Sequence, residues 1–441
     1  MKRHFKIEFF EEPKLELHYP KDFTFKQKHQ YAAFGSALEE AVFLTHPDGK
    51  NVVRISTGLR AALELPDFIS SISLFENGEI LFLGPLIGIY TSGFTPKQLT
   101  PIGPRSDLIA SSMSVHRALG AVPFLFGKEH IDWENGCIHG FFHTEEGWKK
   151  STVPFPSIVM DRLPKRSSEN RHKSVLLKQK FENDYLISWY HPGFFSQLEL
   201  YEKLYNDSRA EQYLPETHPF ISFSSVGRML DDYGHVFLKG DDGHAACQLL
   251  YHPKERLYYC RLFDQTNKLL KFKSLEGFSR RVYGRKQLEK FLIQQGIRLI
   301  RKENKAVDFH VVVNHNNTWE ADTIKVKYAY EQNGTNELSF EDVFQDEEER
   351  NKNLEKLKKA ASEIASAIED NIGGILTGMK LELGIDRDGR IWLLKAEENC
   401  DPALFPHPEL GQTDYLTKRL AGAFLLRSNK TLENELVLSK Q

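Results

Sequence analysis

The sequence near the C-terminus predicts a β-hairpin, which constrains the fold more than any other stretch. Its turn is Asp386–Arg390, where Asp and Gly tolerate the backbone conformations that a short loop needs. Apolar residues flank the turn, and Ile391–Leu394 forms the outgoing strand. The chain therefore needs a sheet near its C-terminus, and this sheet carries Glu382 on one strand and Lys395 and Glu397 on the next.

Length and composition exclude several classes of protein. A chain of 441 residues, 40% of them hydrophobic, is long enough for two to three packed domains. A formal net charge of −3 gives no sign of a nucleic-acid partner. No run approaches the ~20 apolar residues of a membrane span, and Met1–Pro20 lacks the apolar core of a secretory signal. Four scattered cysteines predict free thiols in a reducing cytosol.

Residues 1–83 read as a small β-rich module. Short β-rich runs alternate with Gly- and Asn-containing turns, and Thr57–Leu65 is a candidate helix. The expected strands are Phe5–Phe10, Leu15–His18, Asn51–Ser56 and Glu79–Leu83.

Residues 84–190 predict a Rossmann-like α/β layer. The apolar strand Gly84–Tyr90 is typical of a parallel sheet, and Leu108–Leu119 reads as a helix after it. Ala121–Phe126 and Ser157–Met160 are further buried strands. The glycine spacing does not match a dinucleotide fingerprint, so we expect no NAD site.

Residues 191–430 predict an α+β domain of two lobes with a cleft between them, and 431–441 reads as a tail. The clearest helix is Leu354–Ile368, because its apolar residues recur on one face. The acidic run Asp346–Glu349 precedes it, where a helix N-terminus favours negative charge. The chain as a whole is thus of mixed α+β and α/β class.

Several segments occur in an order that identifies a family resemblance between about residues 79 and 425. They are Gly84–Ile89, Pro154–Arg166, Phe194–Tyr205, Met229–Lys239, Ile293–Ile297 and Asp308–Val313. In this order they resemble the motifs of the YheC/YheD family of endospore coat-associated proteins, which have an ATP-grasp fold.

The resemblance implies ATP and Mg²⁺ as cofactors and suggests their contacts, but it identifies no catalytic residue. Lys239 would neutralise nucleotide phosphate as a point charge. The alternative is that Lys239 is a solvent-exposed lysine at the end of a strand. The resemblance implies that Gln294, Gln295 and Ile297 form the hinge whose backbone groups bind adenine. The alternative is that they form only a strand that follows a helix. Glu382 is the candidate metal ligand.

The family's phosphate loop is altered in this chain. Such a loop packs backbone N–H groups around phosphate, and glycine permits the close approach. Within Leu238–Leu249, Gly243 remains, but His244 replaces the family's serine and two later glycines are gone. Asp241 and Asp242 add negative charge. Taken alone, the segment reads as an exposed hairpin.

The family's metal ligands are altered as well. Lys395 stands where the family has Glu, and Glu397 stands where it has Asn. A lysine ammonium cannot ligate Mg²⁺, which takes oxygen ligands. We expect an ion pair between Lys395 and Glu382, exposed in the cleft, to replace the metal bridge.

Two other positions differ from the family or carry charge. His310 replaces an Arg and shares a strand face with Asp308, and a histidine cannot present a guanidinium's bidentate fork. We expect His310 to pack and hydrogen-bond. Asp161, Arg162 and Arg166 lie in a charged turn. The resemblance suggests a structural or ligand-positioning role for them, and the alternative that we favour is a solvated loop with an ion pair between Asp161 and an arginine.

Three functional hypotheses follow. The first is an endospore coat-associated ATP-grasp-like protein with a degenerate nucleotide and Mg²⁺ site and a structural or assembly role. The second is an active ATP-dependent carboxylate–amine or carboxylate–thiol ligase that acts through an acyl-phosphate, in which Lys395 supplies charge in place of one Mg²⁺. The third is a peptide-binding module without nucleotide. The resemblance implies spore coat proteins as partners and the mother-cell cytoplasm or the spore coat as the location.

Overall fold

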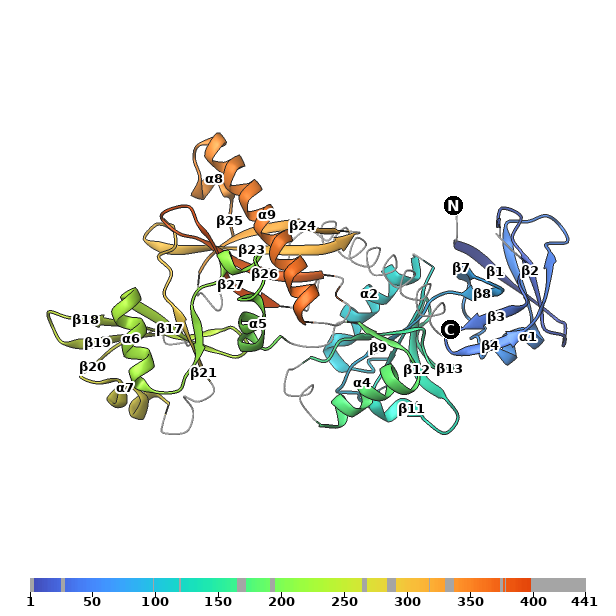
Figure 1. Cartoon of the computed structure of the whole chain (residues 1–441). Coiled ribbons are helices and arrows are strands. Elements are labelled where there is room, and N and C mark those ends of the chain that lie inside the picture. The colour runs from blue at the N-terminus through green and yellow to red at the C-terminus, as the bar shows by residue number, and fades with distance from the viewer. Residues whose placement is uncertain are drawn as a thin grey trace. The chain divides into compact units, whose positions relative to one another are not determined.

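The computed structural model describes residues 4–24, 28–97, 99–118, 120–164, 172–190, 195–263, 268–283, 291–316, 318–329, 337–372, 376 and 378–397. The chain forms two compact units (Figure 1). The described residues of the first unit run from His4 to Tyr190, and those of the second run from Phe195 to Glu397. The domain boundaries expected at residues 83 and 190 stay predictions, and the expected tail 431–441 lies outside the described residues.

The first unit begins with an eight-stranded sheet in the order β4-β3-β8-β7-β1-β6-β2-β5. The four strands expected from the sequence are present, and short strands that the sequence pattern did not single out lie between them. The bounds are β1 His4–Phe10, β2 Glu16–Tyr19, β3 Tyr31–Phe34, β4 Ala37–Glu40, β5 Val42–Thr45, β6 Val52–Ser56, β7 Ser71–Asn77 and β8 Ile80–Leu83. Helix α1 (Thr57–Ala62) begins after Ser56, whose hydroxyl accepts the Leu59 N–H.

The second sheet of this unit contains the parallel layer that the sequence predicted. Strands β10 (Val122–Phe126), β9 (Leu86–Tyr90), β14 (Ile158–Asp161) and β15 (Ser188–Tyr190) pair in parallel in this order. An antiparallel extension adds β11 (Ile131–Asp132), β12 (Cys137–Thr144) and β13 (Gly147–Pro154). The main helices are α2 (Ser106–Ala118) and α4 (His172–Asp184).

The expectation that Asp161 forms an ion pair in a solvated turn is wrong. Asp161 is buried at the end of β14, where its carboxylate accepts the Trp189 Nε1–H at 3.2 Å and the Leu163 N–H at 3.0 Å. Its cationic partner is Lys178 on α4, at 2.8 Å. The parallel layer thus brings together residues that are distant in sequence, which composition could not reveal.

The second unit begins with helix α5 (Gln197–Leu204) and a six-stranded sheet in the order β16-β21-β17-β18-β19-β20. The strands are β16 Thr217–Pro219, β17 His235–Gly240, β18 Ala245–His252, β19 Leu257–Leu262, β20 Leu269–Phe272 and β21 Phe291–Gln295. Helices α6 (Phe223–Tyr233) and α7 (Leu275–Val282) pack on it through an apolar core that includes Met229 and Phe278.

The last sheet contains the hairpin that the sequence predicted. Its order is β25-β24-β23-β26-β27, and β22 pairs with β23. The bounds are β22 Arg301–Lys302, β23 Lys305–Asn316, β24 Thr318–Tyr328, β25 Glu337–Leu338, β26 Gly378–Ile385 and β27 Ile391–Glu397, with helices α8 Phe340–Val343 and α9 Glu347–Ile372. The turn falls at Asp386–Arg390, as expected, and Gly389 takes a φ of 76° there.

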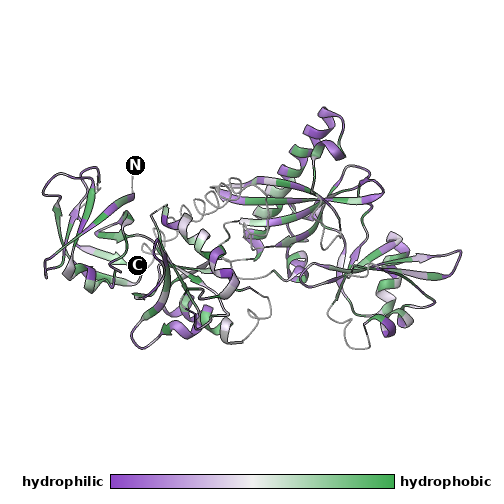
Figure 2. Cartoon of the chain, turned by 180° about the vertical axis from the view of Figure 1, so that it is seen from behind, coloured by the Kyte–Doolittle hydropathy of each residue, from purple (hydrophilic) through white to green (hydrophobic). Residues whose placement is uncertain are grey.

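Helix α9 covers this sheet with an apolar face. Leu357, Ile364 and Ile368 are fully buried in the core that it shares with β23, β24, β26 and β27. Figure 2 shows apolar and polar bands alternating along the helix. The Asp346 carboxylate accepts the Glu349 N–H at 2.8 Å, so the acidic run lies at the helix N-terminus as predicted. No helix among the described residues is long and apolar enough to cross a bilayer.

Candidate functional site

Three neighbouring strands bring the altered metal position together. His310 on β23 lies opposite Glu382 on β26, and Glu382 lies opposite Lys395 on β27. Side chains two residues apart share a strand face, so Asp308, Lys380 and Glu397 join them. We call this set, together with Lys239 from the other sheet of the unit, the ion cluster.

The anionic and cationic groups of the ion cluster contact one another directly. The Lys380 Nζ donates to Glu397 Oε2 at 3.1 Å and to Glu382 Oε1 at 3.5 Å. Asp308 Oδ1 lies 3.1 Å from His310 Nε2. Three carboxylates therefore face three ammonium groups, and their formal charges balance.

The expected ion pair between Lys395 and Glu382 is wrong in its partner and in its exposure. The two residues are cross-strand neighbours, but the Lys395 ammonium donates to Glu397 Oε1 on its own strand and to His244 Nε2 at 3.0 Å. The pairing shifts between Glu382 and Leu383, and Lys380 takes the contact with Glu382 instead. Lys395 is 2% exposed whereas the Glu397 side chain is 28% exposed, so the ammonium is buried and the ion pair as a whole is partly buried.

The charges within the ion cluster shift the pKa values of its members. Burial alone would raise the pKa of Glu382, but His310 and the three lysines together lower it to about 2. Burial lowers the pKa of Lys239 to about 8, although Glu382 opposes that shift. Burial raises the pKa of Asp308, with His310 acting against it. The ionisation of Glu382 thus depends on the cationic groups around it.

Lys239 reaches from its own sheet to the hairpin sheet. Its ammonium donates to the Leu394 carbonyl on β27 at 2.8 Å, and the residue is 4% exposed. The electrostatic influence of Lys239 on Glu382 shows that the two predicted residues lie in one environment. Lys239 is therefore a buried link between sheets and not a strand-end lysine in water.

The altered phosphate loop closes over Lys395. The loop is the tight hairpin between β17 and β18, and Gly243 takes a φ of 79° in it. A Cβ on Gly243 would lie 2.7 Å from Lys395 Cγ and 3.1 Å from the Gln197 side chain, so only glycine fits. His244, which replaces the family's serine, supplies the acceptor for Lys395.

The acidic residue of this loop is fixed to helix α5. Asp241 Oδ1 accepts the Ser196 hydroxyl at 2.8 Å and the Leu198 N–H at 3.2 Å, and the Asp241 carbonyl accepts the Gln197 N–H. The carboxylate thus neutralises the helix N-terminus from within the chain. The Gln197 side chain in turn pairs with both backbone groups of Ala396 on β27.

The predicted adenine hinge keeps one unused backbone donor. The Gln295 N–H donates to the Glu216 carbonyl at 2.7 Å, and the Gly296 N–H donates to the His235 carbonyl at 3.0 Å. Within the described part of the chain, the Ile297 N–H has no acceptor. The Gln294 side chain is buried and donates to Thr217 Oγ1 at 3.0 Å, so it supports the hinge from beneath.

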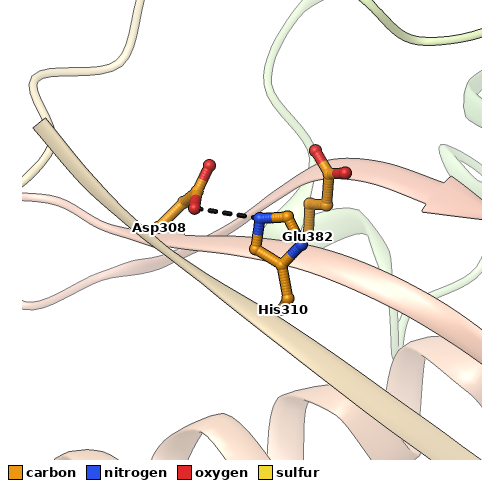
Figure 3. Close-up of side chains that lie close together, drawn as sticks. All are labelled: Asp308, His310 and Glu382. Carbon is orange, nitrogen blue, oxygen red and sulfur yellow. Dashed lines mark hydrogen bonds and ion pairs between the residues drawn. The ribbon is translucent and has the colours of Figure 1, made fainter. Parts of the chain in front are cut away.

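One group of potential metal ligands occurs among the described residues. One ligand atom each from Asp308, His310 and Glu382 lies within 4.8 Å of the other two. Figure 3 shows Asp308 and His310 bonded along one strand and Glu382 beside them on the next. An imidazole with two carboxylates suits a borderline ion such as Zn²⁺ better than Mg²⁺. The three lysines already balance the carboxylates, so the residues do not fit a Mg²⁺ ion in the family's place.

Sequence reasoning did not identify Lys380 or Gln197. Lys380 carries a signal, because its spacing of two from Glu382 puts both side chains on one strand face. Gln197 carries none, because its contact with Ala396 joins residues that lie 199 positions apart.

Comparisons with known proteins agree with this architecture. The YheC/D-like ATP-grasp family model matches residues 186–421. The endospore coat-associated protein YheD of Bacillus subtilis (strain 168) is 29% identical over 403 residues, which cover 88% of each chain.

The structure was also compared with solved ligases, which match it at low identity. D-alanyl-alanine synthetase A from Vibrio cholerae O1 biovar eltor str. N16961 is 11% identical with a TM-score of 0.44, and the match covers 80% of this chain and 99% of that one. The D-alanine-D-alanine ligase from Coxiella burnetii has the same identity and TM-score, with 81% and 100% covered. Because the family model matches more than half of its residues, this chain belongs to the YheC/D-like ATP-grasp family.

Proposed function

We propose that this chain is an endospore coat-associated ATP-grasp protein whose nucleotide and Mg²⁺ site is degenerate, and that it has a structural or assembly role. One observation carries the proposal. The Lys395 ammonium is buried where the family has a metal-binding carboxylate, and it is bonded to Glu397 and His244. A cation of the chain itself therefore stands where the family's metal would bind.

The phosphate loop supports the same proposal. Its surviving glycine packs against Lys395, and its Asp241 carboxylate lies at the N-terminus of α5. A triphosphate brought to this loop would meet a fixed negative charge and would have to break these contacts. Lys239, the remaining phosphate contact, is committed to the Leu394 carbonyl. We therefore expect phosphate recognition to be weak.

The hinge retains more of its capacity. Backbone recognition does not depend on side-chain identity. The Ile297 N–H has no acceptor among the described residues, so it can donate to an adenine ring nitrogen. We expect adenosine, ADP and ATP to bind with similar, weak affinities. Such a site suits a protein that retains the fold as a scaffold.

Calorimetric titration with ATP, with and without Mg²⁺, tests the proposal. The native chain is compared with the double variant Lys395→Glu/Glu397→Asn, which restores the family's metal ligands beside Glu382. We expect Mg²⁺-dependent ATP binding only in the double variant, and no turnover, since the phosphate loop is still altered. The matched control is Lys358→Glu/Glu355→Asn, which makes the same substitutions at an exposed ion pair of α9.

Tight, Mg²⁺-dependent ATP binding by the native chain would overturn the degenerate-site proposal and favour an active carboxylate–amine or carboxylate–thiol ligase. The coat-associated role has a separate test. A fluorescent fusion produced in sporulating B. subtilis should collect at the forming spore surface. A signal that stays evenly spread in the mother-cell cytoplasm would contradict that role. It would leave the conclusion from the ATP titration unchanged.

A further inference from the structure

A cavity lies in the first unit, and its lining includes none of the residues that the resemblance assigns to nucleotide or metal. Its volume is about 350 Å³, and it lies where the start of β7 meets β10, β12, β13 and the end of α2. Small-molecule sites have volumes of roughly 300–1,000 Å³. The cavity is therefore large enough for a small ligand.

One wall of the cavity is apolar and firmly held. Val122 and Phe142 belong to paired strands and are each 2% exposed, and the Phe68 ring packs edge-to-face on Phe142 at 5.3 Å. Ile69 and Pro123 extend this wall. A rigid apolar wall beside open volume is typical of a preformed site for the body of a small molecule.

The lining also includes a guanidinium that has no carboxylate partner among the described residues. Arg117, in the last turn of α2, donates from Nη1 to the His143 carbonyl at 2.5 Å, which fixes its orientation. Among the described residues, its Nε and Nη2 have no acceptor, and no carboxylate lies within ion-pair distance. A guanidinium presents its remaining N–H groups as a planar fork that suits a carboxylate.

The other charges of the lining favour a single negative charge on the ligand. Lys149 is paired with Glu146 at 2.7 Å, so it is already neutralised. Glu145 also lines the cavity, so a ligand of higher negative charge would meet its carboxylate as well, with only Arg117 left outside an ion pair among the described cations of the lining. Arg117 alone would not balance the two negative charges of a phosphate. It does balance the single negative charge of a monocarboxylate.

We propose that the cavity bounded by Phe68, Phe142 and Arg117 is a binding site for a small monocarboxylate with an apolar body. The guanidinium of Arg117 binds the carboxylate, and the Phe68–Phe142 wall takes the apolar part. This site is independent of the nucleotide question, because all of its residues belong to the first unit.

Ligand-observed NMR on the full chain tests the proposal with two probes, 3-phenylpropionate and its neutral isostere 3-phenylpropionamide. We expect the acid to bind with a dissociation constant on the order of 1 mM and the amide about tenfold more weakly. Arg117→Gln should remove the preference for the acid. Arg280→Gln, at an exposed arginine of α7 in the other unit, is the matched control and should change nothing.

Phe68→Ala should weaken the binding of the acid and of the amide by the same factor, because it removes part of the apolar wall and leaves the Arg117 guanidinium in place. If Arg117→Gln disturbs the fold by circular dichroism, Arg117→Lys takes its place, and the acid should then bind a few-fold more weakly for loss of the fork. Equal binding of acid and amide by the native chain would overturn the proposal, and so would the absence of any saturation transfer to the acid.

Discussion

The ion cluster of the second unit and the Arg117 cavity of the first unit differ in how their cationic side chains are paired. In the ion cluster, Lys395 is bonded to Glu397 and Lys380 to Glu382, and a loop closes over Lys395. In the cavity, Arg117 has one backbone partner and no carboxylate partner among the described residues, and open volume lies beside it. At the position where the resemblance implies a metal ligand, Lys395 is bonded to His244 and Glu397, whereas the cavity includes none of the positions that the resemblance assigns to nucleotide or metal. Residue identity alone thus does not locate a binding site.

Glu382→Gln should produce the largest effect, because it breaks the charge balance of the ion cluster. The substitution leaves three ammonium groups facing two carboxylates in a partly buried site. We expect a loss of about 3 kcal/mol in the free energy of unfolding at pH 7, measured by urea denaturation. Glu355→Gln on the exposed face of α9 is the control and should leave stability unchanged within error. A loss no larger than that of the control would mean that the cluster is not a coupled unit.

The pH dependence of that difference gives the next largest effect. Because the folded pKa of Glu382 lies near 2, below its ordinary value, its contribution is fully present above about pH 4.5. The contribution is lost as the pH falls from 4.5 toward 2. The stability gap between native chain and Glu382→Gln, at most about 3 kcal/mol, should therefore close over that range. A gap that stays constant down to pH 2 would contradict the lowered pKa.

Gly243→Ala tests whether the loop truly rests on Lys395. The new Cβ would lie 2.7 Å from Lys395 Cγ, and the φ of 79° disfavours any side chain. We expect a loss of about 2–3 kcal/mol in unfolding free energy. Gly49→Ala is the control, since its φ is also positive but nothing lies within 4 Å, and it should lose only about 1 kcal/mol. Equal losses would show that the loop does not press on the ion cluster.

Asp241→Asn should lower the stability of the chain by a smaller amount and should strengthen ATP binding. Asparagine keeps an acceptor for the Leu198 N–H but removes the negative charge from the N-terminus of α5. We expect a loss of about 0.5–1 kcal/mol in thermal unfolding, together with tighter ATP binding by calorimetry. Asp242→Asn, whose carboxylate serves the His244 N–H instead, is the neighbouring control. If both variants behave alike, the helix contact of Asp241 does not matter.

Arg117→Gln should have the smallest effect on stability, and this sharpens the comparison. Arg117 is only partly buried and makes a single bond to a backbone carbonyl. Its loss should therefore cost about 1 kcal/mol or less in urea denaturation. A loss comparable to that of Glu382→Gln would show that Arg117 holds the first unit together, and the cavity would then resemble the ion cluster.

The sequence by itself determined the elements whose signal is local. The Asp386–Arg390 turn, the amphipathic helix around Leu357 and the apolar strands of the parallel layer follow from turn chemistry and periodicity, which depend on neighbours in the chain. The ordered motifs gave the family for the same reason. These features were predicted correctly because no distant contact overrides them.

Only the tertiary structure decided how the charges pair. The sequence placed Glu382, Lys395 and Lys239 in one region, but it paired Lys395 with the wrong carboxylate and left it in water. Which ammonium meets which carboxylate depends on a shift in strand pairing and on a loop that arrives from another sheet. Coulomb energies change steeply with burial and with a few ångströms of distance, and neither quantity is written in the local sequence. For the same reason, the sequence did not predict that the Arg117 guanidinium lines a cavity, because that position depends on the strands packed around it.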